Sequence, residues 1–128
     1  MSTTEVDAKL KDFRALQAEI QNLYSQKTGK LSQFNENTLV KGELDLLSEE
    51  IPVYKLVGPV LMTIEIKEAK DNVQKRLEFI EGEIQKLDDA IAKKQGEQAD
   101  LSETIQSLQM KMQREASAAA TAVVQESS

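Results

Sequence analysis

The side chains that could do chemistry in this chain of 128 residues are almost all carboxylates and amines. Asp and Glu number 22 and Lys and Arg number 16, while His and Cys are absent. Without His and Cys there is no Ser–His or Cys–His nucleophile, no imidazole or thiolate metal ligand, and no disulfide. The glycines are scattered, so they form no phosphate-binding loop. We therefore predict no enzyme activity, no metal and no cofactor.

The composition is typical of helices that pack against each other. Charged residues make up 30% of the chain and aromatic residues only 4%, which fits a coiled coil better than a globular core. The net charge of −6 argues against nucleic acid and anionic membrane as partners. No apolar run approaches the roughly 20 residues that span a bilayer, and the first residues lack the features of a signal peptide. We therefore expect a soluble, intracellular protein.

An unbroken heptad repeat runs through the second half of the chain. Its core positions alternate in spacing between four and three residues, which is the pattern of a coiled-coil seam. They are Val73, Leu77, Ile80, Ile84, Leu87, Ile91, Lys94, Gln98, Leu101, Ile105, Leu108 and Met112. The first half has a similar series at Val6, Leu10, Phe13, Gln17, Ile20, Tyr24, Lys27, Leu31 and Phe34.

The two series are placed symmetrically about Pro59. Phe13 and Ile105, for example, lie equally far from Pro59, and Gly58-Pro59 is a chain-reversal signal. The pattern predicts a mainly α fold: a long antiparallel two-helix coiled coil with helices over about 5–50 and 66–115. The Ala- and Ser-rich residues 116–128 are predicted to form a disordered tail.

The segment between the helices has the residues of a β-hairpin. It is rich in β-branched and apolar side chains, which predicts strands over about 53–57 and 60–64. Gly-Pro is not a favoured two-residue hairpin turn, so the pattern leaves open a wider turn. Apolar residues fall on both faces of this hairpin. Either it is a small cap on the helix ends, or its strands pair with strands of other subunits.

Two further features of the helices each allow two interpretations. After Phe34 the first series would meet Thr38, Lys41 and Asp45, while the apolar residues move to Leu39, Val40, Leu44, Leu46 and Leu47. This phase slip either follows local supercoil geometry or turns the helix toward a subunit interface. In mid-coil, Gln17 is expected to face Leu101, and Lys27 to face Ile91. Such mixed layers fix the register of the helices or let the arm bend.

The free end of the predicted coiled coil is also apolar. Val6, Leu10 and Phe13 are expected to meet Leu108, Met110 and Met112. Because helix ends fray and Met is adaptable, this end could bind other chains. Ordinary seam filling accounts for most of these residues equally well, but Met110 lies off the seam.

Three segments resemble the β-type subunits of the prefoldin family. They are Asn37-Thr-Leu-Val-Lys-Gly-Glu-Leu-Asp-Leu-Leu47, Val53-Tyr-Lys-Leu-Val-Gly-Pro-Val-Leu61 and Asn72-Val-Gln-Lys-Arg-Leu-Glu-Phe-Ile80. The resemblance implies a heterohexamer of α-type and β-type subunits, whose strands form a shared β-body from which the coiled coils extend. It also implies an ATP-independent co-chaperone of the cytoplasm. Such a complex holds unfolded polypeptides, notably actin and tubulin, and delivers them to the group II cytosolic chaperonin.

The patterns and the resemblance together assign two sets of site residues. The residues expected in subunit assembly are Leu44, Leu47, Val53, Tyr54, Leu56, Val57, Gly58, Pro59, Val60, Leu61, Met62 and Ile64. The residues expected to contact clients are Val6, Leu10, Phe13, Leu108, Met110 and Met112. A function of another class stays open, in which the chain is a scaffold or tether that joins two folded partners.

Overall fold

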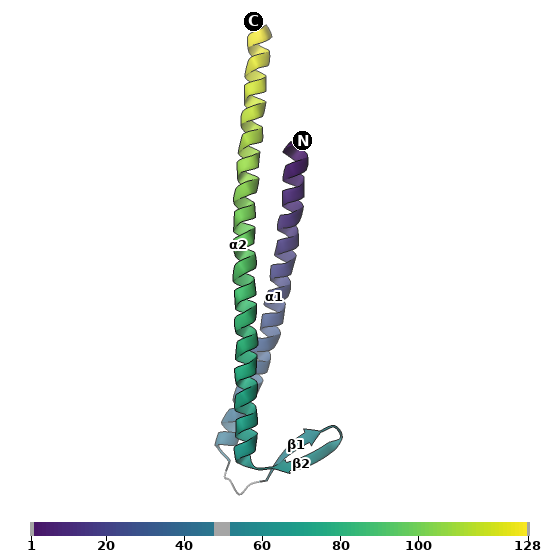
Figure 1. Cartoon of the computed structure of the whole chain (residues 1–128), viewed down its shortest axis with the longest axis vertical. Helices are drawn as coiled ribbons and strands as arrows, with labels where there is room; N and C mark the ends of the chain where they lie inside the picture. Colours follow the sequence, from purple (N-terminus) through teal and green to yellow (C-terminus); the bar gives the residue numbers. More distant parts are fainter. Residues whose placement is uncertain (1, 48–51, 128) are drawn as a thin grey trace. The chain divides into compact units, whose positions relative to one another are not determined.

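The structure, a computed structural model, describes residues 2–47 and 52–127. Along the chain lie helix α1 (Ser2–Asp45), strands β1 (Val53–Val57) and β2 (Val60–Ile64), and helix α2 (Ile66–Ser127) (Figure 1). This order confirms the predicted fold class of two long helices with a β-hairpin between them.

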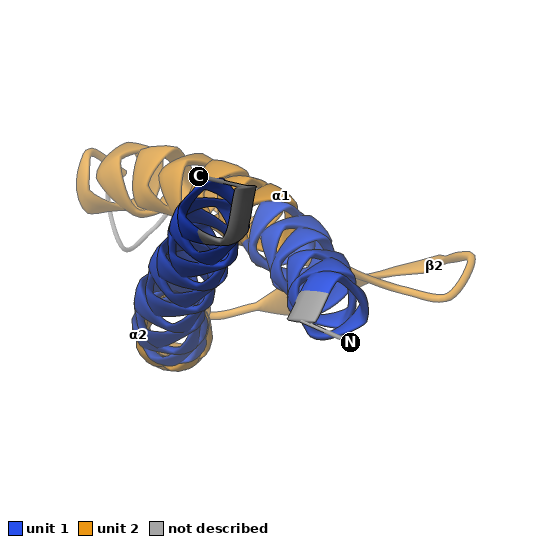
Figure 2. Ribbon diagram, turned by 90° about the horizontal axis from the view of Figure 1, so that it is seen from above, with its two compact units in different colours: residues 1–23, 90–128 blue, residues 24–89 orange. Residues whose placement is uncertain are grey.

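The chain divides into two compact units, each built from parts of both helices (Figure 2). The hairpin unit comprises residues 24–89, and the terminal unit comprises residues 1–23 and 90–128. In the hairpin unit, Leu44, Ala69, Val73 and Leu77 form a buried cluster against which Phe34, Val53 and Ile64 pack. In the terminal unit the buried apolar residues are Val6, Ile20, Ile91 and Ile105.

The predicted seam of α2 agrees with burial in the structure. Every predicted position from Val73 to Met112 is buried or half-buried. Lys94 and Gln98 are half-buried too, because their long aliphatic stems can cover apolar surface while their polar ends reach water.

The predicted seam of α1 is partly wrong. Phe13, Ile20 and Phe34 are covered as expected, whereas Gln17, Tyr24 and Leu31 are exposed. The half-buried positions are instead their neighbours, which are Leu16, Leu23 and Lys30. Both choices keep the heptad spacing, and burying Leu16 and Leu23 instead of Gln17 and Tyr24 removes more apolar surface from water.

With this correction the phase slip after Phe34 disappears. The covered face of α1 continues through Asn37, Lys41 and Leu44 at the same alternating spacing. Leu44 is buried within the chain, while Leu39 and Leu46 are exposed. The apolar residues near the end of α1 therefore divide between an internal core and an exposed surface.

The polar contacts between the helices join residues other than the predicted facing pairs. Gln17, expected opposite Leu101, accepts a hydrogen bond of 2.7 Å at Oε1 from Gln98 Nε2. Lys27, expected opposite Ile91, forms an ion pair of 2.7 Å with Asp88. In both units, therefore, polar side chains of the two helices contact each other, which the predicted layers of one polar and one apolar residue did not include.

α1 ends earlier than predicted. It stops at Asp45, and the amides of Leu46 and Leu47 donate to the carbonyls of Glu43 and Leu44, at 3.2 Å and 3.1 Å. Such i→i−3 bonds tighten the last turn of a helix and end it. Residues 48–50, into which we predicted the helix to continue, lie outside the described residues.

The hairpin turn is a two-residue turn and no wider. Val57 pairs with Val60, so only Gly58 and Pro59 lie between the strands. Gly58 has φ of +59°, the left-handed value that the first position of a type II′ turn requires. Proline at the second position fits, because its fixed φ near −65° is close to what that turn needs.

α2 begins at the predicted residue but extends beyond the predicted end. The first helical hydrogen bond runs from the amide of Ala69 to the carbonyl of Glu65, at 3.0 Å. The helix continues to Ser127, so the prediction of a disordered tail from residue 116 is wrong for residues 116–127. Alanine is the best helix former, which explains why this Ala-rich segment continues the helix.

Candidate assembly and client-binding surfaces

The β-hairpin carries apolar residues on both faces. Residues opposite each other in an antiparallel pair lie on the same face. One face has Val53 with Ile64, Lys55 with Met62, and Val57 with Val60. The other face has Tyr54 with Thr63 and Leu56 with Leu61.

Most of these apolar side chains are open to solvent. Six residues of the hairpin are between 49% and 67% exposed: Tyr54, Leu56, Val57, Val60, Leu61 and Met62. The sheet has only these two strands within the described part of the chain, so both edges offer free backbone groups. A two-stranded sheet of this kind is marginal in water by itself. Its surface is therefore suited to contact with further strands.

The base of the hairpin is held by the helices of its own unit. Val53 and Ile64 are half-buried and pack against the cluster of Leu44, Ala69, Val73 and Leu77. Leu44 thus has an internal packing role, whereas Leu47 is exposed. The structure brings the predicted assembly residues together on one hairpin and its base, with Leu44 as the most covered of them.

The predicted client-binding residues are mostly covered. Val6 is buried, and Leu10, Phe13, Leu108 and Met112 are half-buried, so they fill the seam of the terminal unit. Met110 differs, since it is 49% exposed and lines a pocket with Gln113, Arg114 and Ser117. Met110 is therefore the one predicted tip residue whose side chain is largely accessible in this conformation.

Polar contacts join the two helices of the terminal unit beyond the apolar seam. Lys94 forms an ion pair of 2.9 Å with Glu19, next to the Gln17–Gln98 hydrogen bond. The hydrogen bond that Lys94 donates to Glu19, together with the negative charge of Glu19, raises the pKa of Lys94 above its ordinary value. These contacts align the two helices with each other. They therefore favour the interpretation that the polar seam positions fix the register of the helices over the interpretation that they let the arm bend.

Several exposed apolar residues were missed by the sequence analysis. Phe79 is 65% exposed, although it follows the seam residue Leu77 by only two positions. Val123 and Val124 are also exposed, in the part of α2 that we expected to be a tail. Mapping the α2 heptad onto a helix would have placed Phe79 outside the seam. Predicting the exposure of Val123 and Val124 would have required knowing that α2 continues that far.

The described residues show no cluster of three or more acidic side chains that could hold a metal ion. Within residues 2–47 and 52–127, neither helix has a stretch apolar enough to cross a membrane.

Two helices joined by an apolar β-hairpin define a class of coiled-coil proteins. Comparison with known proteins identifies the family within this class. The Prefoldin_2 family of prefoldin subunits matches residues 7–112. The chain is 38% identical over 109 residues to prefoldin subunit 6 of Arabidopsis thaliana, covering 85% of this chain and 84% of the relative. It is 43% identical over 94 residues to prefoldin subunit 6 of Saccharomyces cerevisiae, covering 73% of this chain and 80% of that relative.

A solved structure supports the same fold. The prefoldin beta subunit from Thermococcus strain KS-1 superposes with a TM-score of 0.77 at 23% identity, over 80% of this chain and 90% of that one. The chain belongs to the prefoldin subunit family. The predicted resemblance to eukaryotic prefoldin subunit six is confirmed by these relatives.

Proposed function

We propose that this chain is one subunit of a heterohexameric co-chaperone, made with other α-type and β-type prefoldin subunits. In this proposal the complex holds unfolded polypeptides such as actin and tubulin and delivers them to the group II cytosolic chaperonin. Capture depends on apolar contacts, so no nucleotide and no catalytic group is needed. We propose a cytoplasmic location because the proposed clients and chaperonin are cytosolic.

The observation that carries this proposal is the hairpin with apolar side chains exposed on both faces. Burying apolar surface contributes about 25 cal/mol per Å2, so six large side chains left in water represent a substantial driving force for association. Strands of neighbouring subunits can cover both faces and pair with both free edges at once. Membership of the prefoldin family supports this reading of the hairpin.

Client capture is proposed for the free end of the terminal unit. Met110 is accessible there, and fraying of the helix ends would expose Leu10, Phe13, Leu108 and Met112. Each such site binds weakly, but several sites on one particle raise the effective concentration of the second and later contacts. The same multivalency lets a client leave by stepwise release without hydrolysis.

Native mass spectrometry tests the assembly. This chain would be measured alone and then together with the other prefoldin subunits of the same organism. We expect a particle of six different subunits only in the mixture. A monomer or homodimer that ignores the other subunits would reject the proposal and favour the scaffold or tether.

A second measurement distinguishes a co-chaperone, which binds unfolded chains, from a tether, which binds folded proteins. Six-chain particles would be added to chemically denatured actin during dilution, and light scattering would record its aggregation. Suppression of aggregation by the particle, with no binding to native actin, is the expected result. A tether would bind a folded partner and leave the aggregation of denatured actin unchanged.

A further inference from the structure

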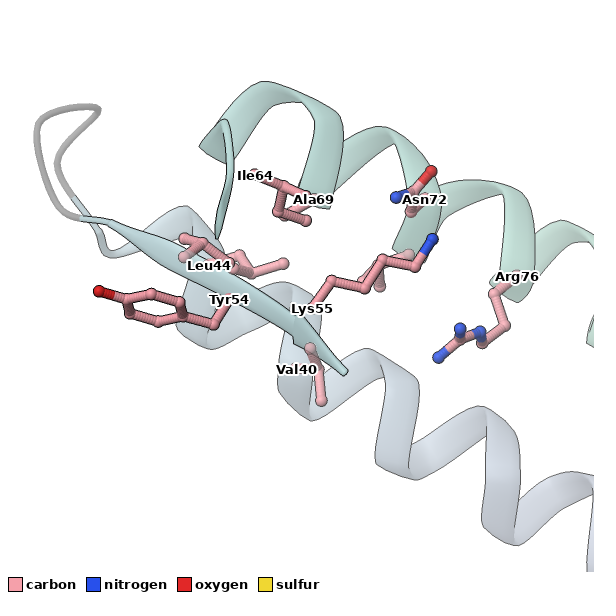
Figure 3. A pocket seen from close by; sticks show the side chains of 10 residues that line it. Val40, Leu44, Tyr54, Lys55, Ile64, Ala69, Asn72 and Arg76 are labelled. Carbon is pink, nitrogen blue, oxygen red and sulfur yellow. The ribbon is translucent and has the colours of Figure 1, made fainter. Parts of the chain in front are cut away.

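A pocket of about 360 Å3 opens beside the base of the hairpin, wholly within the hairpin unit (Figure 3). Its apolar wall includes Val40 and Leu44 from α1 and Val53 and Ile64 from the strands. Lys55 of β1 and Arg76 of α2 also line it. Figure 3 shows Lys55 extending from β1 toward α2, while Arg76 extends from α2 into the space between the elements. The cavity thus combines an apolar wall with two cations at its side.

These two cations differ from the other basic residues nearby. Lys41 donates to Gln74 Oε1 at 2.8 Å, and Lys70 lies 3.8 Å from Asp45. Lys55 and Arg76 have no hydrogen bond or ion pair within the described ranges 2–47 and 52–127. Among the described residues that line the pocket there is no Asp or Glu, although the chain has 22 acidic residues against 16 basic ones. The described lining of the pocket is therefore positively charged on an otherwise acidic chain.

We propose that this pocket receives the side chain of an Asp or Glu from a neighbouring prefoldin subunit. The proposal rests on the proposed function, because it needs assembly through the hairpin. Three of the pocket-lining residues, Val53, Tyr54 and Lys55, belong to β1, the strand expected to contact other subunits, so the pocket continues that surface. A strand that pairs with the hairpin brings its flanking residues to the pocket.

The chemistry of the pocket favours a carboxylate-bearing side chain over a free inorganic anion. The apolar wall matches the methylene groups of Asp or Glu, which an inorganic anion lacks. The guanidinium of Arg76 can bind both oxygens of one carboxylate, and the amine of Lys55 adds a further charge. Apolar strand contacts would supply affinity, whereas this pocket would select the partner, because a basic residue at the same place is repelled.

Charge removal at the two cations tests the proposal. Arg76→Gln and Lys55→Gln would be compared with Lys75→Gln, an exposed cation of α2 that does not line the pocket. Assembly with the other five subunits would be followed by analytical ultracentrifugation at about 0.05 M and 0.5 M salt. We expect Arg76→Gln to weaken assembly about tenfold at low salt and Lys55→Gln about threefold, with Lys75→Gln unchanged. Arg76→Lys, which keeps the charge, should recover part of the loss.

High salt sharpens this test. The wild-type complex should weaken as salt screens the ion pair, while Arg76→Gln should depend less on salt. Circular dichroism of each isolated variant controls for loss of helix. Equal assembly of Arg76→Gln and wild type at both salt concentrations would overturn the proposal.

Zero-length cross-linking identifies the partner residue. A carbodiimide joins an amine to a carboxylate only when the two groups are in contact. In the assembled complex we expect an amide between Lys55 and an Asp or Glu of another subunit, found by mass spectrometry of the peptides. If other lysines are joined across subunits and Lys55 never is, the pocket has no carboxylate partner.

The outcomes distinguish this inference from the proposed function. If wild type does not assemble with the other subunits, both proposals are wrong. If wild type assembles and Leu61→Asp abolishes assembly, but the pocket variants assemble normally without a Lys55 cross-link, only the inference about the pocket is wrong.

Discussion

The hairpin unit and the terminal unit are built from the same two helices, but they present apolar side chains in opposite ways. In the hairpin, six large apolar residues are exposed on both faces of a two-stranded sheet. In the terminal unit, Val6, Leu10, Phe13, Leu108 and Met112 are buried or half-buried in the seam. Permanent exposure requires a permanent partner, whereas residues that become accessible only when helices separate suit weak and reversible contacts. The difference supports the proposed division between a surface for assembly and a surface for transient client binding.

Leu61→Asp should have the largest effect, because it tests whether the hairpin is a permanent interface. Burying an uncharged polar group without a partner costs about 2–7 kcal/mol and burying a carboxylate costs more, so assembly should weaken by more than about a hundredfold. Native mass spectrometry of the mixed subunits would show the chain left free. The isolated variant should keep its helices in circular dichroism, since Leu61 is 65% exposed in the chain alone.

Ser102→Asp, an exposed change on α2 in the terminal unit, is the control for Leu61→Asp. It adds the same charge far along the chain from the hairpin and should assemble like wild type. Normal hexamers that contain Leu61→Asp would mean that the hairpin strands are not interface.

Truncation of leucine compares the internal packing of the two units. Leu77 is 7% exposed and belongs to the hairpin cluster, so Leu77→Ala should lower the free energy of unfolding by about 2–3 kcal/mol. Leu108 is only half-buried, and Leu108→Ala should cost about 1 kcal/mol because less apolar surface is lost. Thermal unfolding of the isolated chains would measure both changes.

Phe79→Ala is the matched control for Leu77→Ala, two residues away on the same helix. Its 65% exposure predicts a change within about 0.5 kcal/mol. If Leu108→Ala were as costly as Leu77→Ala, the contrast between a firmly packed hairpin base and a looser free end would be lost.

Phe13→Ser combined with Met110→Ser should weaken client holding several-fold while leaving assembly intact. Both changes remove apolar contact surface from the free end, and several remaining sites on the particle limit the loss. The measurement is suppression of the aggregation of denatured actin by particles that contain the variant. Loss of the hexamer in this variant would contradict the division between the two surfaces.

Leu101→Ser controls for the stability of the arm, because Leu101 is half-buried in the seam away from the free end. It should loosen the helices without removing a proposed client contact. If it reduced client holding as much as the Phe13/Met110 pair, the effect would come from arm stability.

The smallest effect is expected at Lys94, whose pKa is raised by the hydrogen bond and charge of Glu19. A raised folded-state pKa means that the stabilisation is present below the ordinary lysine pKa and is lost as the pH rises through the folded value. Lys94→Gln should therefore lower Tm slightly at pH 7 and by less near pH 11. Thermal unfolding at both pH values measures this, and an equal loss of Tm at both would exclude the ion pair as its cause.

The sequence predicted the helices, the strands and the α2 seam because each of these depends on local spacing. It did not decide between Leu16 and Gln17, or between Leu23 and Tyr24, since both members of each pair continue a heptad from Phe13. The wrong member of each pair produced a predicted phase slip after Phe34 that the structure does not have. Pairwise contacts between helices depend on both seams together, so an error in one seam carries over to the other.

The exposed apolar surface of the hairpin was predictable because strands with two apolar faces cannot be covered by the two helices that adjoin them. The exposed Phe79 and the pocket with Lys55 and Arg76 were not predictable in this way. Lys55 and Arg76 come from different elements, and nothing in their local sequence shows that they line the same cavity. Only the packing of the hairpin base against α1 and α2 brings them together.

The regular covered face of α1, which runs through Leu16, Leu23, Lys30, Asn37 and Leu44 every seven residues, has a consequence for design. If seven residues were deleted from α1 together with the seven residues opposite them in α2, the covered face of each helix would remain continuous. The same holds for insertion. Arm length is therefore a modular quantity, adjustable in steps of two helical turns, and a graded series of arms could be compared for the size of client that each complex accommodates.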